Sequence, residues 1–121
     1  MKLINRKEFL RFPKGTLYFK CPSPWIFDNL SIKGETWKDS DGIDFEFTYS
    51  GFDTPVNEGS ADLTFVLETM LKTGCSIPVD ISYGRDGTYD DSETFLILEQ
   101  HDLSALRAYV DQAIALLGLD D

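Results

Sequence analysis

The pattern of hydrophobic and polar residues along the chain predicts strands in five segments, three of them by alternation. Residues 43–49 (IDFEFTY) alternate without a break, so their apolar side chains would line one face of a half-buried strand. Residues 30–37 (LSIKGETW) and 76–83 (SIPVDISY) show the same period of two. Residues 16–21 (TLYFKC) are rich in β-forming side chains, and residues 94–98 (TFLIL) are almost wholly apolar, which is typical of a central strand covered on both faces.

Turn-forming residues indicate how these strands are connected. The Asp and Gly residues of 38–42 (KDSDG) favour a tight turn, so the strands on either side should form a β-hairpin. Residues 84–87 (GRDG) are expected to be a second turn. Because Pro78 has no amide hydrogen to donate, we expect the strand that contains it at an edge of the sheet.

Helical periodicity appears in two longer segments. Residues 60–73 carry an apolar stripe at helical spacing, with Ser60 suited to the N-cap and Gly74 to the position after the last turn. Residues 102–117 carry a second stripe, which ends at Gly118. We expect both stripes to pack against the sheet.

A short helix and the overall class complete the predicted fold. Asn5 can cap one or two helical turns that run to Phe12, and Pro13 would end them. The elements together predict a single α+β domain over residues 1–121. Its sheet is expected to be mostly antiparallel with about five strands, and the two main helices are expected on one face.

The acidic excess narrows the class of partner. The chain has 21 acidic and 11 basic residues, for a net charge of −10. Nucleic acids and anionic membranes bind clustered Lys and Arg, so we expect neither as a direct ligand. A basic surface on a protein partner is the expected target, because long-range attraction raises the encounter rate. The alternative is that the charge serves solubility alone.

The cysteines and the first residues predict a cytoplasmic protein. The opening segment lacks the apolar region of a signal peptide, and no apolar stretch is long enough to span a bilayer. Cys21 and Cys75 do not have the spacing of metal ligands, so we expect two buried, reduced thiols, no metal and no cofactor. Whether the chain is a monomer or a homodimer stays open at this point.

Two acidic clusters are the candidate partner-binding residues. The first is the turn with Asp39, Asp41 and Asp44. It has some likeness to a calcium loop, but Trp37 and Asp44 occupy positions that such a loop does not allow, so a hairpin turn is the better interpretation. The second cluster lies between two predicted strands and would place rigid aromatic area beside acids, or else form a solvated loop with an internal ion pair. Its members are Arg85, Asp86, Tyr89, Asp90, Asp91 and Glu93.

Catalytic interpretations find little support in the residues. His101 is the single histidine and lies at the expected start of the last helix, where a capping or solvent-facing role is usual. A Cys–His pair would need an orienting group and a cause for a lowered thiol pKa, and the sequence indicates neither. The chain lacks the motifs of serine hydrolases, P-loop proteins and dinucleotide-binding proteins. Trp25, Phe27 and Trp37 flank loops and are expected at the edges of the core.

Three segments resemble small open reading frames of bacteriophages and prophages. They are MKLINRKEFLRFPKGTLYFK at the start, LSIKGETW in the middle, and GRDGTYDD further on. The resemblance covers most of the chain, and its motifs are structural rather than catalytic. It implies a phage accessory protein, a class that often inhibits host defence proteins, in some cases by imitating DNA.

Three functions follow as hypotheses. The first is an acidic inhibitor of a host protein in defence or nucleic-acid binding. The second is an immunity or antitoxin protein that neutralises a basic toxin. The third is a small-ligand binder, which would need a pocket holding His101 or a cysteine, and a virion role is also open.

Overall fold

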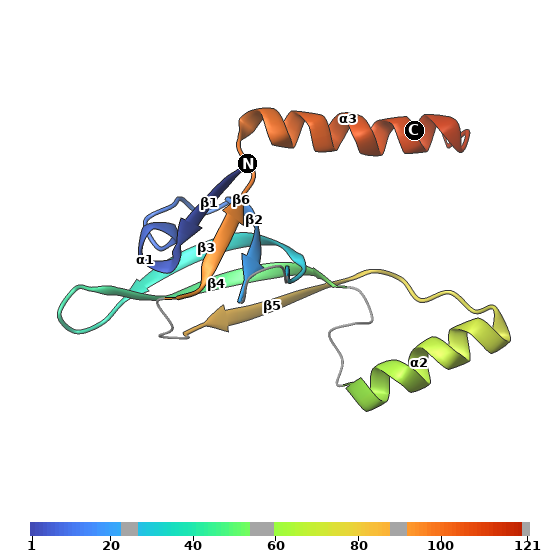
Figure 1. The fold of residues 1–121 in the computed structure, drawn as a ribbon, viewed down its shortest axis with the longest axis horizontal. Helices are drawn as coiled ribbons and strands as arrows, with labels where there is room; N and C mark the ends of the chain where they lie inside the picture. The colour runs from blue at the N-terminus through green and yellow to red at the C-terminus, as the bar shows by residue number, and fades with distance from the viewer. Residues whose placement is uncertain (23–26, 54–59, 88–91, 120–121) are drawn as a thin grey trace.

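The computed structural model shows an α+β fold built on one open antiparallel sheet of six strands (Figure 1). It describes residues 1–22, 27–53, 60–87 and 92–119. The elements in chain order are β1 (Lys2–Asn5), α1 (Arg6–Phe9), β2 (Leu17–Cys21), β3 (Leu30–Lys38), β4 (Asp44–Asp53), α2 (Ser60–Thr73), β5 (Asp80–Asp86), β6 (Thr94–Ile97) and α3 (Gln100–Leu116).

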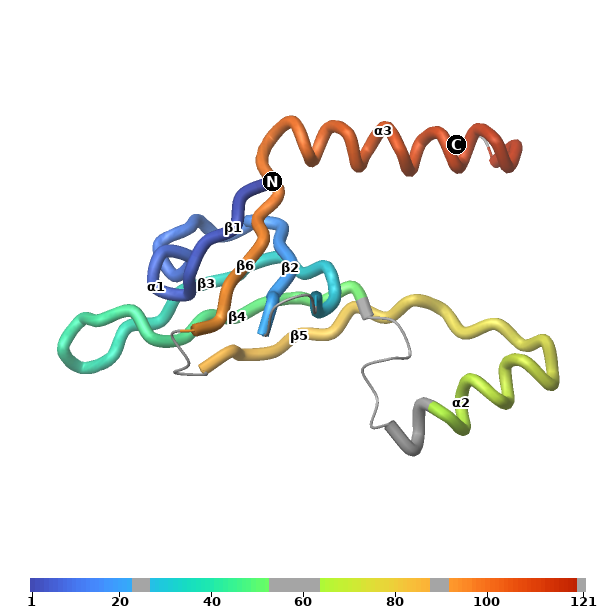
Figure 2. Tube along the Cα trace, viewed as in Figure 1, coloured from blue at the N-terminus to red at the C-terminus, as the bar shows by residue number. Residues whose placement is uncertain are grey.

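The strand order β1-β6-β2-β3-β4-β5 places the first and last strands of the chain side by side. The sixth strand, β1, was not predicted, because four residues are too few to show a period. It pairs antiparallel with β6, which therefore lies between β1 and β2, inside the sheet as expected. The Cα trace in Figure 2 shows these three strands crossing the direction of β3, β4 and β5.

The predicted hairpin is confirmed, and its turn is held by one side chain. The Oδ1 atom of Asp39 accepts hydrogen bonds from the amides of Asp41 at 2.9 Å and Ile43 at 3.0 Å. Gly42 has a φ of 77°, a region that glycine adopts without steric cost. β3 and β4 pair antiparallel on either side of this turn, with two irregularities in register.

The turn predicted at residues 84–87 was wrong for most of its length. Residues 84–86 belong to β5 and not to a turn, because the long strand β4 offers pairing partners as far as Phe47. Arg85 pairs with Thr48 and Asp86 with Phe47. Pro78 lies before the strand, yet β5 is at the edge of the sheet, as expected.

An aromatic cluster under α1 forms the core. Asn5 caps α1 as predicted, since its Oδ1 accepts from the amide of Glu8 at 2.8 Å. This cap directs Phe9 onto the sheet, where its ring stacks on Phe95 with 4.2 Å between centroids. We call this side of the sheet the inner face. Its buried apolar residues are Ile4, Phe9, Leu10, Tyr18, Phe47, Phe95 and Ile97.

The two long helices begin and end where expected but do not pack on the sheet, which corrects the predicted architecture. Gly74 and Gly118 follow α2 and α3 with positive φ, as predicted for helix ends. No residue of α3 is buried, and on α2 the side chains of Phe65 and Leu71 are 71% and 88% exposed. Figure 1 shows α3 leading away from β6 and α2 lying beyond the start of β5. Periodicity identifies an apolar face, but it cannot say what covers that face.

The predicted burial of the cysteines and of the aromatic residues beside loops is confirmed only for Cys21. Cys21 is buried, but Cys75 is exposed because it follows the end of α2, which has no covering layer. Phe27 and Trp37 are 56% and 41% exposed and so are not core residues. Trp25 lies outside the described residues. None of the described helices has the length and apolar character that crossing a membrane requires.

We expect Phe9→Ala to lower the free energy of unfolding by about 3–5 kcal/mol, because the fully buried ring contacts Tyr18, Phe47 and Phe95. Urea denaturation followed by fluorescence measures this change. Phe65→Ala, on the exposed face of α2, is the matched control and should change stability far less. Equal losses in the two variants would show that the core does not lie under α1.

Candidate functional site: a buried charge cluster and an acidic hairpin

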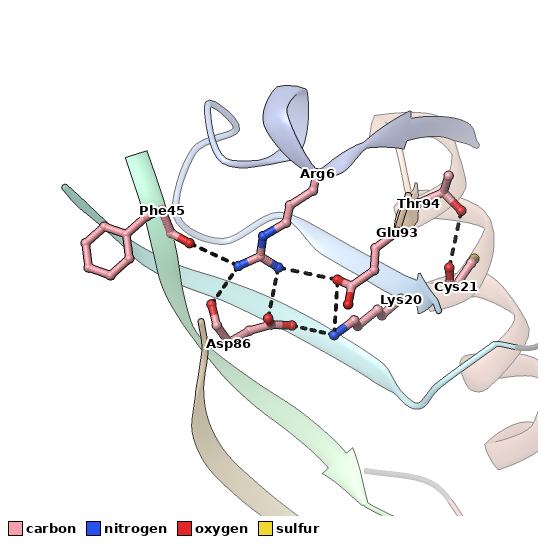
Figure 3. Close-up of polar contacts among 7 residues, drawn as sticks. All are labelled: Arg6, Lys20, Cys21, Phe45, Asp86, Glu93 and Thr94. Atoms are coloured by element: carbon pink, nitrogen blue, oxygen red, sulfur yellow. Dashed lines mark hydrogen bonds and ion pairs between the residues drawn. The ribbon is translucent and has the colours of Figure 1, made fainter. Parts of the chain in front are cut away.

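A single arginine connects both edges of the sheet at the inner face. Arg6 begins α1, directly after edge strand β1, and its side chain is 3% exposed. Its Nη1 donates to Oδ1 of Asp86 at 2.9 Å, and its Nη2 donates to the carbonyl of the same residue at 2.8 Å and to that of Phe45 at 3.1 Å. The planar guanidinium thereby joins α1 to the end of β5 and the start of β4 (Figure 3).

A lysine and a second carboxylate complete the charge cluster, which comprises Arg6, Lys20, Asp86 and Glu93. The Nζ atom of Lys20, on β2, lies 2.8 Å from Oδ2 of Asp86 and 3.3 Å from Oε2 of Glu93. Burial lowers the pKa of Lys20, but the hydrogen bond and charge of Asp86, assisted by Glu93, outweigh it, so the pKa is raised. Lys20 is therefore a fixed cation at neutral pH.

Two of the predicted partner-binding acids belong to this cluster and face inward. Asp86 and Glu93 are 8% and 4% exposed, so their carboxylates are engaged inside the protein rather than presented to a partner. Among the described residues, no buried side-chain nitrogen or oxygen lacks a hydrogen-bond partner. The alternation pattern gave no signal for this cluster, because Arg6 and Lys20 look like ordinary surface cations in the sequence.

Arg85 is occupied by a different contact. Its Nε and Nη2 atoms each lie 2.9 Å from the carboxylate of Glu46, and its guanidinium lies 4.0 Å from the centre of the Trp37 ring. The stack holds Trp37 against β5 although its ring is partly exposed. The remaining members of the second predicted cluster, Tyr89, Asp90 and Asp91, lie outside the described residues.

The first predicted acidic cluster is a solvent-exposed hairpin end. Asp39 and Asp41 are exposed, and Figure 1 shows the β3–β4 hairpin extending past the rest of the sheet. Asp44 is half-buried and is paired with Lys38, with 2.7 Å between Nζ and Oδ1. We call residues 39–42 the acidic tip. The structure therefore brings Asp39 and Asp41 together at one exposed place and separates them from Asp86 and Glu93.

A polar hollow lies beside the charge cluster on the inner face. Its volume is about 460 Å³, and small residues that are neighbours across three strands, Ser31, Gly51 and Ser82, form part of its wall. Tyr18 and Lys20 also line it. Burial, followed by the charge of Asp86, raises the pKa of Tyr18, so its hydroxyl keeps its proton at neutral pH. Neither His101 nor a cysteine contributes to this wall, although the ligand-binding hypothesis asked for one of them.

The candidate catalytic side chains lie apart from this hollow. Burial raises the pKa of the Cys21 thiol, which disfavours the reactive thiolate. His101 is 77% exposed at the start of α3, with Nε2 3.4 Å from Asp102. Possible ligand atoms of Glu99, His101 and Asp102 lie within 4.8 Å of one another, but exposed groups of this kind are common on surfaces that hold no metal.

Comparisons of the chain with protein-family models, with curated proteins and with solved structures found no match.

We expect Arg6→Ala to lower the free energy of unfolding by about 3–5 kcal/mol, because the buried carboxylates of Asp86 and Glu93 lose one of their two cations and keep Lys20 alone. Lys14→Ala is the control: Lys14 also pairs with a carboxylate, but both side chains are more than half exposed, so the loss should stay under about 1 kcal/mol. Chemical denaturation of both variants measures the difference. A small loss for Arg6→Ala would mean that the cluster does not hold the edges together.

The stability of the protein should fall as the pH rises above about 10, the ordinary pKa of tyrosine. In the unfolded chain Tyr18 ionises there, whereas in the folded protein its raised pKa keeps the proton bound, so the folded state binds more protons and loses stability with increasing pH. The raised pKa of Lys20 acts in the same direction. Tyr18→Phe should lose less stability than the parent between pH 9 and pH 11 in urea titrations. Equal losses would contradict the role of Tyr18.

Proposed function

We propose that this protein binds a basic surface of another protein through the acidic tip of the β3–β4 hairpin. The observation that carries the proposal is the exposed position of Asp39 and Asp41 at the end of a hairpin that extends beyond the sheet (Figure 1). Acidic side chains in such a position meet a cationic surface first during an encounter.

The turn itself supports binding because it is ordered before any partner arrives. Two amides of the turn donate to Asp39, and the amide of Gly42 donates to the Asp39 carbonyl at 3.0 Å. A loop held in this way loses little conformational freedom when it binds, and so less of the binding energy is spent on ordering it.

The distribution of charge supports an anionic exterior. The buried charged residues are the cations Arg6 and Lys33 and the anions Glu46, Asp86 and Glu93, which differ by one charge. Nine of the ten excess acidic residues therefore lie elsewhere in the chain. An excess of this size attracts cationic partners and repels nucleic acid over about one Debye length, roughly 8 Å at physiological salt.

The resemblance to small phage and prophage open reading frames supports a more specific role. On that basis the protein would be an accessory inhibitor, and its partner would be a host protein in defence or nucleic-acid binding, whose phosphate-binding surface the acids occupy. The tip alone does not separate this role from that of an immunity protein, because both need an exposed acidic surface.

Tagged protein should capture one stoichiometric partner from nuclease-treated host lysate at low salt, and Asp41→Lys should abolish the capture. Asp41 is the residue to reverse, because its own side chain holds no part of the turn whereas Asp39 does. Asp39→Asn keeps the oxygen that accepts the two amides and should weaken capture by loss of charge alone. Mass spectrometry of the eluates identifies and quantifies the partner.

Charge reversal at Asp111→Lys is the matched control, since Asp111 is an exposed acid on α3, far from the hairpin in the fold. Capture should survive this change and should fade as salt is added. A partner that is retained equally by Asp41→Lys and by the parent, or that binds equally well at high salt, would contradict the proposal.

A further inference from the structure

The face of the sheet opposite α1 is apolar, and no helix or strand among the described residues covers it. Residues directly opposite each other in an antiparallel pair share a face, and the registers place Leu3 and Phe19 on either side of Leu96. Leu30 follows on the far side of Phe19. The same rule adds Ile32, beside Leu17 on β2. We call this side the outer face. Its apolar residues are Leu3, Leu17, Phe19, Leu30, Ile32, Phe52, Ile81, Tyr83 and Leu96.

Much of the outer face is open to solvent. Leu3 is 59% exposed, Ile32 47% and Phe52 50%, at positions that span the sheet from its first strand to β4. A shallow hollow of about 660 Å³ lies on this face, with Ile32, Ser50 and Tyr83 in its wall. An apolar sheet face of six strands is normally covered by a helix or a second sheet, since covering it supplies most of the hydrophobic stabilisation.

Helix α3 has an apolar stripe of the kind that could cover such a sheet face. Along α3 the residues Leu103, Leu106, Val110, Ala113 and Leu117 follow one another at alternating steps of three and four, which places them on one stripe. None is buried, and Val110 and Leu117 are 49% and 72% exposed. An isolated helix of this length is marginal in water and usually owes its stability to packing of its apolar face. The 17 residues of α3 extend about 25 Å, and the 9 residues of β3 extend about 30 Å, so the helix fits along the face.

The connection to α3 directs it away from its own sheet. The amide of Leu98 still donates to the Leu17 carbonyl at 2.9 Å, so the ladder holds the chain up to this residue. One residue later the helix has started: the amide of Glu99 donates to Asp102 at 2.8 Å, and its carbonyl accepts from Leu103 at 3.0 Å. As α3 stands, no residue of it is buried against its own sheet, whereas a second molecule can reach its stripe (Figure 1).

The charge of the two surfaces is compatible with a second copy as the occupant. Two chains of net charge −10 repel each other, so they can associate only through surfaces that bring few acids together. At the margin of the outer face the carboxylate of Glu46 is neutralised by Arg85, at 2.9 Å. Between Leu103 and Leu117 the stripe has one acid, Asp111, and one base, Arg107, within its length.

From these observations we propose that the protein forms a two-fold symmetric dimer in which α3 of each copy packs its stripe on the outer face of the other. The exchange makes the same helix–sheet contact twice, as a closed two-fold interface requires. The proposal goes beyond binding at the acidic tip and does not depend on it, because the tip and the outer face are separate surfaces.

Light scattering coupled to size-exclusion chromatography should give twice the mass of the chain at micromolar concentration. Val110→Asp places a charge at the centre of the stripe and should convert the dimer to a monomer. Ala108→Asp adds the same charge on the opposite side of α3 and should leave the dimer intact. A monomeric parent, or equal behaviour of the two variants, would overturn the proposal.

Cross-linking decides which surfaces meet. In a Cys75→Ser background, one preparation carries Val110→Cys and another carries Ile32→Cys, and the two are mixed and oxidised. A covalent dimer that forms only on mixing is the expected result. A covalent dimer formed by the Val110→Cys preparation alone would show that helix packs against helix. In a chain that carries both substitutions, a disulfide within that one chain would show that α3 packs on its own sheet. Either result would overturn the exchange. Asp41→Lys should keep the dimer, so failure of the acidic tip as a binding site and failure of the dimer give different results.

Discussion

The fold depends on the guanidinium of Arg6, which satisfies groups from elements that are distant in sequence. It reaches Asp86 at the end of one edge strand from a helix that follows the other edge strand, and on the way it bonds the Phe45 carbonyl. A buried cation is costly unless its donors find acceptors, and here two carboxylates and two carbonyls supply them. Because the geometry of a guanidinium is planar and forked, these contacts also determine the relative positions of the pieces they join.

The aromatic cluster and the charge cluster are two parts of one arrangement. Arg6 and Phe9 lie one helical turn apart on α1, and the Arg6 guanidinium lies 5.3 Å from the Phe47 ring that also contacts Phe9. Packing of Phe9 against Phe95 brings α1 down onto the sheet, and this holds the polar contacts of Arg6 in a region that water does not reach. The polar hollow beside Lys20 marks where this cover ends. The inner face is thus closed by α1 and its charges, while the outer face has no comparable cover among the described residues.

The acidic tip and the outer face suit different kinds of contact. The tip is charged and held by its own hydrogen bonds, which favours a fast, salt-sensitive encounter with a cationic surface. The outer face and α3 are apolar and almost without net charge, which favours a contact that excludes water and tolerates salt. A protein that used both would bind its target as a two-fold assembly, with one tip from each copy.

The local pattern of the sequence determined the short-range features. Alternation located β3 and β4 closely, β-forming residues located β2, and an apolar run located β6. The helical stripes located α2 and α3, and Asn5, Gly74 and Gly118 marked helix ends, because such signals depend on neighbouring residues. Tertiary structure alone decided the rest. β1 is a strand because β6 pairs with it, and residues 84–86 extend β5 because β4 continues opposite them. Asp86 and Glu93 looked like surface acids until the fold brought Arg6 and Lys20 beside them, and the stripes of α2 and α3 showed an apolar face without its partner. Pairing, ion contacts and packing join residues that are far apart in sequence, and a local pattern has no information about such neighbours.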